Sequence, residues 1–164
     1  MAEDNFTLTT IYTQWKAHQD RLAAALAPLT AEQLALRAAP GLRSIGENAT
    51  HIVAVRAGWF TYTLGEDGGP DVKAYTGWYE PEGPARTAAE FVEGLDRTWQ
   101  LMAGCLARWS PADMHQTFPD EHKGVQVQLS RAWIIWHVLE HDLHHGGEVS
   151  LILGIHGLQA GFTS

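Results

Sequence analysis

The longest amphipathic segment of the chain contains the sequence WHVLEHDLHH, residues 136–145, in which histidines and apolar residues share one helical repeat. A helix turns by about 100° per residue, so His141 and His145 project from the same face, roughly 6 Å apart. Two imidazoles at this spacing can bind one metal ion. Four apolar residues lie on the same line as this pair: Ile134, Val138, Val149 and Ile152. We therefore predict a helix over residues 130–153 with both histidines on its buried face.

Three further segments repeat their apolar residues with helical spacing: residues 7–27, 44–64 and 87–109. Capping boxes, in which Ser or Thr is followed three positions later by Glu or Gln, mark helix starts at three places: Thr30 with Gln33, Ser44 with Glu47, and Thr87 with Glu90. The first of these predicts only a short turn over residues 30–36. Together with the segment at 130–153, the pattern predicts an all-α fold, a four-helix bundle.

The connections between the expected helices are long. Residues 65–86 contain many Gly, Pro and aromatic residues without periodicity, which predicts a crossover loop anchored by Trp78 and Tyr79. In residues 112–129, the alternation Val-Gln-Val-Gln-Leu after a turn at Lys123 and Gly124 predicts a small hairpin or an extended arm before the last helix. Connections of about 20 residues favour a bundle with long crossovers over a simple up-down-up-down arrangement.

Composition limits the classes of protein to which the chain can belong. Its 164 residues fit one domain of roughly 100 to 200 residues, so we expect a single domain over residues 1–164. No apolar run approaches the roughly 18 residues of a membrane span. A net charge of -8, without a cluster of Lys and Arg, argues against a nucleic-acid partner. Residues 1–5 lack the basic start and apolar stretch of a secretory signal, so we expect a cytoplasmic protein without a membrane partner.

A third imidazole is available from the helix expected over residues 44–64. His51 shares one side of that helix with five other residues: Asn48, Ile52, Val55, Trp59 and Tyr62. We therefore expect His51 to point inward. Buried imidazoles without partners cost roughly 1 to 3 kcal/mol each, and a shared ion would remove that cost. With His51, His141 and His145 as ligands, a divalent ion, zinc or nickel, would keep an open position for water or substrate.

Other side chains near the three histidines leave alternatives open. A single inward histidine is more often a core residue that donates to a backbone carbonyl than a metal ligand. His137 and His144 lie roughly 40° to 60° from the main line, so either can replace a proposed ligand. Glu148 can orient a ligand imidazole, bind the ion or act as a base toward bound water, which makes it the candidate for a catalytic residue. A solvated or salt-bridging Glu is the more common case.

Four further residues have a simpler interpretation. Glu140 and Asp142 point away from the histidine line and are expected on a solvated face. Asn48 can line the same cavity as His51 or satisfy a helix-start amide. Cys105 is the only cysteine, so the chain has no internal disulfide and no thiolate-rich zinc site. Its position within the helix expected over residues 87–109 favours a small buried hydrophobe over a reactive thiol.

Residues 137–153, HVLEHDLHHGGEVSLIL, resemble the signature of the DinB-like (DinB/YfiT-like) family of metal-binding four-helix bundles. The inward His51 matches as well, and the resemblance covers almost the whole chain in the order and spacing of its helices. It implies His51, His141 and His145 as ligands of a divalent metal, a homodimer, and helices in an atypical order. The family commonly shows Arg-Gly-Gln after the second histidine of the pair, whereas Gly146-Gly147-Glu148 stands here. This difference removes a cation and adds a carboxylate, so no substrate is carried over.

Relatives of this fold include thiol-dependent transferases and isomerases that use bacillithiol, mycothiol or glutathione, which is an analogy at the level of fold. We expect metal-dependent chemistry that activates a small thiol or a water, as in a thiol-dependent S-transferase or a hydrolase. The alternatives are a non-catalytic metal-binding stress-response module and a dimeric interaction protein without metal. The sequence lacks a nucleophile elbow, a phosphate loop and a dinucleotide fingerprint, which excludes Ser hydrolases, NTPases and Rossmann oxidoreductases.

Overall fold

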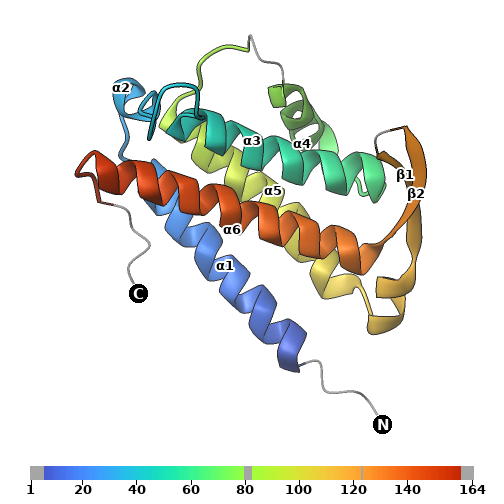
Figure 1. Ribbon diagram of the computed structural model, residues 1–164. Helices are drawn as coiled ribbons and strands as arrows, with labels where there is room; N and C mark the ends of the chain where they lie inside the picture. The colour runs from blue at the N-terminus through green and yellow to red at the C-terminus, as the bar shows by residue number, and fades with distance from the viewer. Residues whose placement is uncertain (1–5, 80–82, 123, 160–164) are drawn as a thin grey trace.

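A computed structural model describes residues 6–79, 83–122 and 124–159 of the chain (Figure 1). Four long helices make up most of it: α1 (Phe6–Leu26), α3 (Ile45–Gly58), α5 (Ala88–Arg108) and α6 (Arg131–Ile155). Shorter elements connect them: α2 (Ala31–Leu34), η1 (Trp59–Thr63), α4 (Gly69–Tyr75), η2 (Thr76–Tyr79), η3 (Pro111–His115), β1 (Thr117–His122) and β2 (Val125–Ser130). The predicted all-α bundle with long crossover connections is confirmed.

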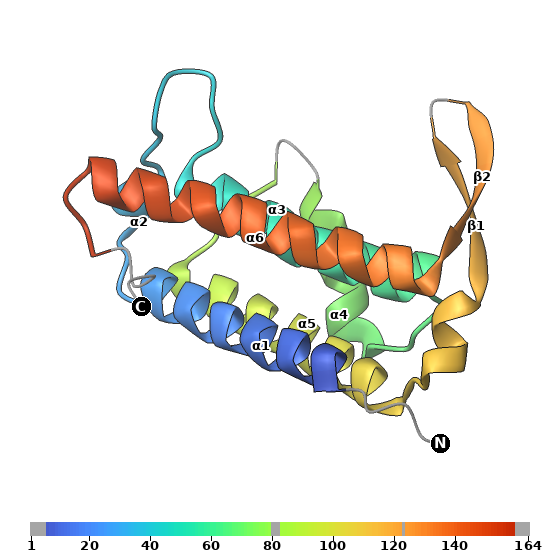
Figure 2. The same cartoon turned by 60° about the horizontal axis from the view of Figure 1, so that its bottom comes forward.

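The four long helices form two layers. α3 and α6 lie side by side in one layer, and α1 and α5 form the other, as a comparison of Figures 1 and 2 shows. α3 also packs against α5, so the two layers share a core. This arrangement turns the inner faces of α3 and α6 toward each other along their length. Side chains from these two helices can therefore meet although about 90 residues separate them in the chain.

Side-chain hydrogen bonds fix the starts of α2, α3 and α5, as the capping boxes predicted. At each start a Ser or Thr hydroxyl accepts from the amide three positions on, and the Glu or Gln at that position accepts from the amide of the capping residue. The amides of the first helical turn lack partners within the helix, so these bonds satisfy two of them. The start of α3 at Ser44 sets the rotation of the helix and therefore the direction of His51.

The end of this helix differs from the prediction. The segment 59–63, η1, is a π-helix, whose wider turn changes the rotation of the residues that follow Gly58. Tyr62 was predicted on the inward face, but its side chain is 74% exposed and its hydroxyl lies 3.2 Å from Oγ1 of Thr76. The predicted inward orientation of Tyr62 is wrong because an unbroken α-helical repeat was assumed to continue to Leu64.

The crossover over residues 65–86 is more ordered than the loop that the sequence predicted. It contains the helix α4 and the single turn η2. Pro70 lies in the first turn of α4, where its missing amide hydrogen costs no hydrogen bond, and Val72 and Tyr75 bury their side chains against the core. A helix of seven residues is too short to show a clear apolar repeat. Trp78 packs against the same core, which confirms it as an anchor of the crossover.

The hairpin before the last helix is confirmed. β1 and β2 pair in an antiparallel ladder with Phe118 opposite Leu129. Of the predicted turn residues, Lys123 lies outside the described residues, whereas Gly124 adopts a φ of 79°, a backbone conformation that favours glycine. β2 leads directly into α6, whose first turn is capped by the Ser130 hydroxyl. No described helix combines the length and the apolar character that crossing a membrane requires.

A buried polar network joins three of the long helices and corrects a prediction. Asp142 was expected on a solvated face, but it is fully buried and forms an ion pair of 2.7 Å with Arg56 of α3. The indole Nε1 of Trp15, on α1, donates to the same carboxylate at 2.7 Å. Gln19 accepts from Arg56 at 2.6 Å. The carboxylate is tolerated inside the bundle because charged and polar donors satisfy it. Glu140, by contrast, is exposed as expected.

Candidate metal centre

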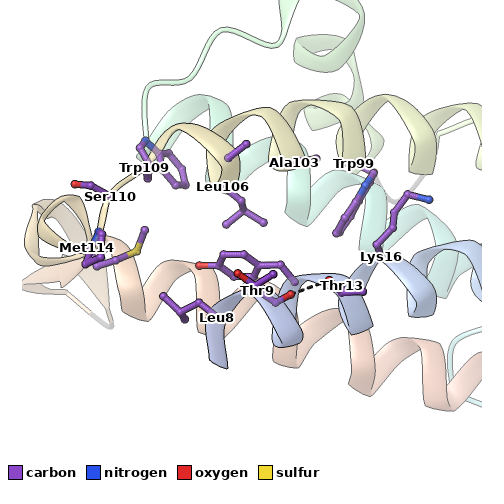
Figure 3. Close-up of a pocket in the computed structure, with 13 residues that line it drawn as sticks. Leu8, Thr9, Thr13, Lys16, Trp99, Ala103, Leu106, Trp109, Ser110 and Met114 are labelled. Atoms are coloured by element: carbon purple, nitrogen blue, oxygen red, sulfur yellow. Dashed lines mark hydrogen bonds between the residues drawn. The ribbon is translucent and has the colours of Figure 1, made fainter. Parts of the chain in front are cut away.

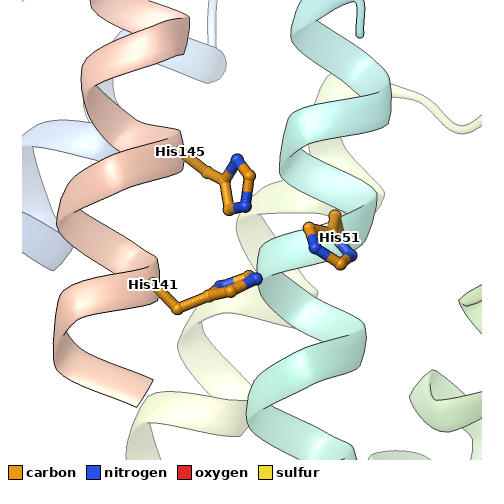
Figure 4. A group of neighbouring side chains, drawn as sticks. All are labelled: His51, His141 and His145. Carbon is orange, nitrogen blue, oxygen red and sulfur yellow. The ribbon is translucent and has the colours of Figure 1, made fainter. Parts of the chain in front are cut away.

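Three imidazoles from the inner faces of α3 and α6 meet halfway along the two helices. His51 comes from α3, and His141 and His145 come from consecutive turns of α6 (Figure 4). Their ring centroids are 4.5 Å apart for His51 and His141, 4.8 Å for His51 and His145, and 4.4 Å for His141 and His145. One nitrogen from each ring lies within 4.8 Å of the other two. The structure thus brings together the three residues that the sequence singled out.

Two observations distinguish this cluster from ordinary core histidines. His141 is only 9% exposed, and neither of its ring nitrogens has a hydrogen-bond partner in the described part of the chain. A core histidine normally donates to a carbonyl, as His18 does to the backbone oxygen of Asp142 at 3.1 Å. Leaving a buried polar group without a partner costs about 1 to 3 kcal/mol. A cation bound by the three imidazoles would satisfy one of the unpaired nitrogens, so the donor set fits a divalent metal.

The surroundings keep all three imidazoles neutral, which is the form that binds metal. Burial, the charge of Arg43 and a proton on His145 together lower the pKa of His51 to about 4, although the Glu148 carboxylate acts in the opposite direction. Burial also lowers the pKa of His141 strongly, and protons on His145 and His51 act in the same direction. The pKa of His145 falls for the same reason, although the Glu148 carboxylate partly offsets the effect. Three neutral nitrogen donors are available at neutral pH.

Glu148 orients one of these donors. Its Oε2 lies 2.7 Å from Nδ1 of His145, one turn earlier on α6. A carboxylate at Nδ1 fixes the tautomer and the ring orientation, and leaves Nε2 free to face the other two rings. Glu148 also lies 3.5 Å from the more exposed His144. His144, His145 and Glu148 form a second group of donors within 4.8 Å of one another, so the alternative in which His144 and Glu148 bind the ion has a geometric basis as well.

The other neighbours of the cluster have different environments. His137 stacks on Trp133 at 5.1 Å with an interplanar angle of 11°, and its ring lies 6.1 Å from His141, outside both groups of donors. Asn48 is buried, in agreement with its expected position near His51. Its Oδ1 lacks a hydrogen-bond partner among the described residues. Tyr79, from η2, sets its ring 5.5 Å from His51 in an edge-to-face contact. Aromatic rings therefore lie on two sides of the cluster, Tyr79 beside His51 and Trp133 beside His137.

The sequence did not identify Arg56 as part of the site's support. Arg56 is fully buried and holds Asp142, the residue that follows His141. The sequence held a partial signal, because Arg56 is a charged residue that follows an apolar stretch of its helix. Pairing Arg56 with Asp142 requires knowledge of how α3 packs against α6. Cys105, in contrast, is buried and its pKa is raised to about 11, chiefly by burial, as expected for an unreactive thiol.

Two of the cavities in the described part of the chain bear on access to the site. One, of about 630 Å³, lies at the amino end of α3 and reaches His51 and Tyr79. The other, of about 540 Å³, lies between α1 and α5 (Figure 3). The second is lined mainly by apolar side chains, among them Leu8, Trp99 and Leu106, and it contains none of the clustered histidines. Of these two cavities, the first therefore gives a small molecule access to His51, one of the three imidazoles.

Comparisons with known proteins agree with this architecture. The model of the DinB superfamily matches residues 14–149, which include all three histidines. A crystal structure of a DinB-like protein from Bacillus cereus ATCC 10987 superposes with a TM-score of 0.72 and 19% sequence identity, and the match covers 94% of this chain and 95% of that one. At this identity the likeness establishes the fold alone. No curated protein matches the chain.

Proposed function

This chain belongs to the DinB superfamily, and from that premise we propose that His51, His141 and His145 bind one divalent cation, zinc or nickel, in a metal-dependent enzyme. The observation that carries the proposal is the environment of His141, because both nitrogens of a buried imidazole lack partners at the point where two other imidazoles converge. Core packing alone gives no reason to keep an imidazole without partners beside two other imidazoles in a bundle interior.

The proposed reaction is the transfer of a small thiol to an electrophile, as in an S-transferase, or the hydrolysis of a small substrate. A bound cation would supply Lewis acidity that lowers the pKa of a thiol or a water. Glu148 holds the ring of His145 through Nδ1, and the ring of Tyr79 lies against His51. A small thiol is the proposed partner, within a cytoplasmic homodimer. Protein ligands from only three side chains would leave a position open for it.

Elemental analysis of protein purified without a histidine tag tests this function. We expect about one zinc or nickel ion per chain in the unaltered protein. The variants His51→Ala and His141→Ala should lose the ion, whereas His115→Ala, which alters an exposed histidine of η3, should keep it. Retention of the ion in His51→Ala together with its loss in His144→Ala would move the site to His144, His145 and Glu148. Protein without metal that still turns over a thiol substrate would contradict the proposal.

The second candidate function is a non-catalytic metal-binding module. The distribution of the three histidines over α3 and α6 favours it. Because they come from two helices that pack together, an ion would tie α3 to α6 and stabilise the bundle. The two functions differ in what chelation does. A purely structural ion predicts a lower melting temperature after chelation and no turnover of any thiol-electrophile pair by the loaded protein. The cavity that reaches His51 favours the catalytic function.

A further inference from the structure

The cavity beside His51 has an apolar wall and a charged rim. The first turns of α3, the short helix α2, the turn η2 and residues 83–86 enclose it. Leu34, Trp78 and Phe91 form its apolar wall, and Trp78 contacts Phe91 edge to face at 6.0 Å. A volume of about 630 Å³ lies within the range of cavities that hold small organic ligands.

Positive charge dominates this cavity although the protein as a whole carries a net charge of -8. Among the residues that the structure describes, three arginines line it, Arg37, Arg43 and Arg86, together with one carboxylate, Glu47. The carboxylate is already occupied, because Arg37 donates to both of its oxygens, at 2.5 and 2.6 Å. Two arginines therefore remain without a carboxylate of their own among the described lining residues.

The two remaining arginines differ in their contacts. The guanidinium of Arg86 lies 3.9 Å from the centre of the Trp78 ring, so a cation–π contact holds it against the apolar wall. Arg43 is exposed and makes no hydrogen bond or ion pair with any residue that the structure describes. Its five N–H donors are free for a ligand, and their planar arrangement suits a carboxylate or a phosphate.

The charge of Arg43 acts on all three imidazoles. It contributes to the lowered pKa values of His51, His141 and His145, and it partly offsets the rise that burial causes in the pKa of Tyr79. A cation that acts on all four groups lies within the electrostatic reach of the whole site. An anion bound at Arg43 would have its other end directed along the cavity toward His51.

We propose that this cavity binds a small organic anion, whose carboxylate or phosphate contacts Arg43 and whose apolar body lies against Trp78 with its reactive end beside His51. The inference rests on the proposed function, because it places the reactive end of the anion next to a bound cation. The contact with Arg43 does not depend on the metal. The inference specifies the substrate as an anion with an apolar portion, and it gives Arg43 the role of a binding residue.

Calorimetric titration with three probes of similar size tests the proposal. Phenyl phosphate and benzoate each carry an anionic group on an aromatic ring, and benzyl alcohol carries none. We expect at least one of the two anions to bind the metal-loaded protein, and benzyl alcohol to bind at least about tenfold more weakly. Whichever anion binds identifies phosphate or carboxylate as the recognised group.

Variants of two arginines locate the binding site. Arg43→Ala should weaken binding of the anion at least about tenfold, and Arg43→Lys should restore part of it, because one charge remains without the planar donors. Arg97→Ala is the matched control, since Arg97 is exposed on α5, away from this cavity, and pairs with Asp71 and Glu93. Equal effects of Arg43→Ala and Arg97→Ala, or equal binding of benzyl alcohol, would overturn the proposal. Because Arg43 is exposed, its removal leaves the core intact, and circular dichroism verifies this.

Repeating the titration after chelation separates this proposal from the proposed function. If elemental analysis finds no metal but the chelated protein still binds phenyl phosphate in a manner that depends on Arg43, the anion site stands and the metalloenzyme fails. If the metal is present and Arg43→Ala binds the anions as the unaltered protein does, the anion site fails and the metal centre stands. A shift of the Trp78 indole resonance on titration supports the position of the apolar body. Its absence, with shifts confined to other tryptophans, contradicts it.

Discussion

Gly146 follows the second histidine of the pair and is buried between α6 and α1. A Cβ atom added here would lie 2.7 Å from both Cε1 and Nε2 of the His18 ring. That ring cannot move away without losing its hydrogen bond to the carbonyl of Asp142. The contact leaves no room for a side chain at this position, because His18 occupies the space beside it.

The neighbouring pair of glycines offers a matched test. Gly146→Ala should lower the free energy of unfolding by about 1 to 3 kcal/mol, because the new methyl group overlaps the ring of His18. Gly147→Ala should instead raise it by roughly 0.5 to 1 kcal/mol, since this residue faces open space in an exposed helix position. Urea denaturation of the metal-free proteins measures both changes. Stabilisation of similar size by the two substitutions would mean that α1 does not approach α6 at His18.

Cys105 should react slowly with alkylating reagents. Its side chain is 1% exposed and its pKa is raised to about 11, mainly by burial and further by the charge of Glu66. Since only the thiolate reacts, alkylation by iodoacetamide at pH 8 should be on the order of 100-fold slower in the folded protein than in urea. Mass spectrometry of time points measures the two rates. Equal rates would show that the α5 end of the core opens readily.

The packing of α3 against α6 depends on the buried pair of Arg56 and Asp142. Two bonds from Nε of Arg56 to the carboxylate, at 2.9 and 3.0 Å, hold the helices in one register. His51 precedes Arg56 by five residues, and His141 directly precedes Asp142. The register that the ion pair sets is therefore the register in which the imidazoles meet. The ion pair lies on the core side of the helices, and the imidazoles lie nearer to the cavity.

Removing the charge of Asp142 should destabilise the protein more than any exposed substitution. Asp142→Asn leaves the Arg56 guanidinium buried without a counter-charge, which typically costs about 3 to 5 kcal/mol. Glu140→Gln, an exposed change of the same kind on the same helix, should alter the free energy of unfolding by less than about 0.5 kcal/mol. Denaturant titrations of the metal-free variants compare the two. A loss below about 1 kcal/mol in Asp142→Asn would show that water reaches Arg56.

The protein as a whole should lose stability as the pH falls below 6.5, when no metal is bound. The pKa of His51 is about 4 in the folded protein, and those of His141 and His145 are also lowered, whereas the unfolded chain has ordinary values near 6.5. Between pH 6.5 and 4 the unfolded chain binds more protons, so the free energy of unfolding decreases as the pH falls through this window.

Comparison with a variant isolates this effect from the titration of carboxylates. In His51→Asn the same pH decrease should cause a smaller loss of stability, because one of the lowered groups is gone. Thermal unfolding of chelated protein at intervals from pH 7 to pH 4.5 provides the data. Identical slopes for the two proteins would contradict the lowered pKa of His51. Saturating zinc should raise the stability of the unaltered protein in this range and leave the slope at least as steep, because the bound ion keeps the imidazoles of the folded protein free of protons.

Much of the architecture followed from local chemistry. The starts of α2, α3 and α5 were predicted because a capping box satisfies amides within four residues and needs no other part of the chain. The pair His141 and His145 was predicted to share a face because helical spacing alone decides it. Its inward direction followed from the apolar residues on the same line, and the structure buries that line.

Contacts between distant segments decided the rest. Asp142 reads as a surface residue until Arg56 and Trp15, from other helices, are placed beside it. α4 takes its order from the core against which Val72 and Tyr75 pack, and Tyr62 turns outward through a change of helical pitch that no residue pattern signals. The sequence by itself determined that His141 and His145 share the buried face of α6, because that depends on a period of a few residues. Only the tertiary structure decided that His51 meets the pair on α6 and that Arg43 lines a cavity beside it, because both depend on how helices far apart in the chain pack.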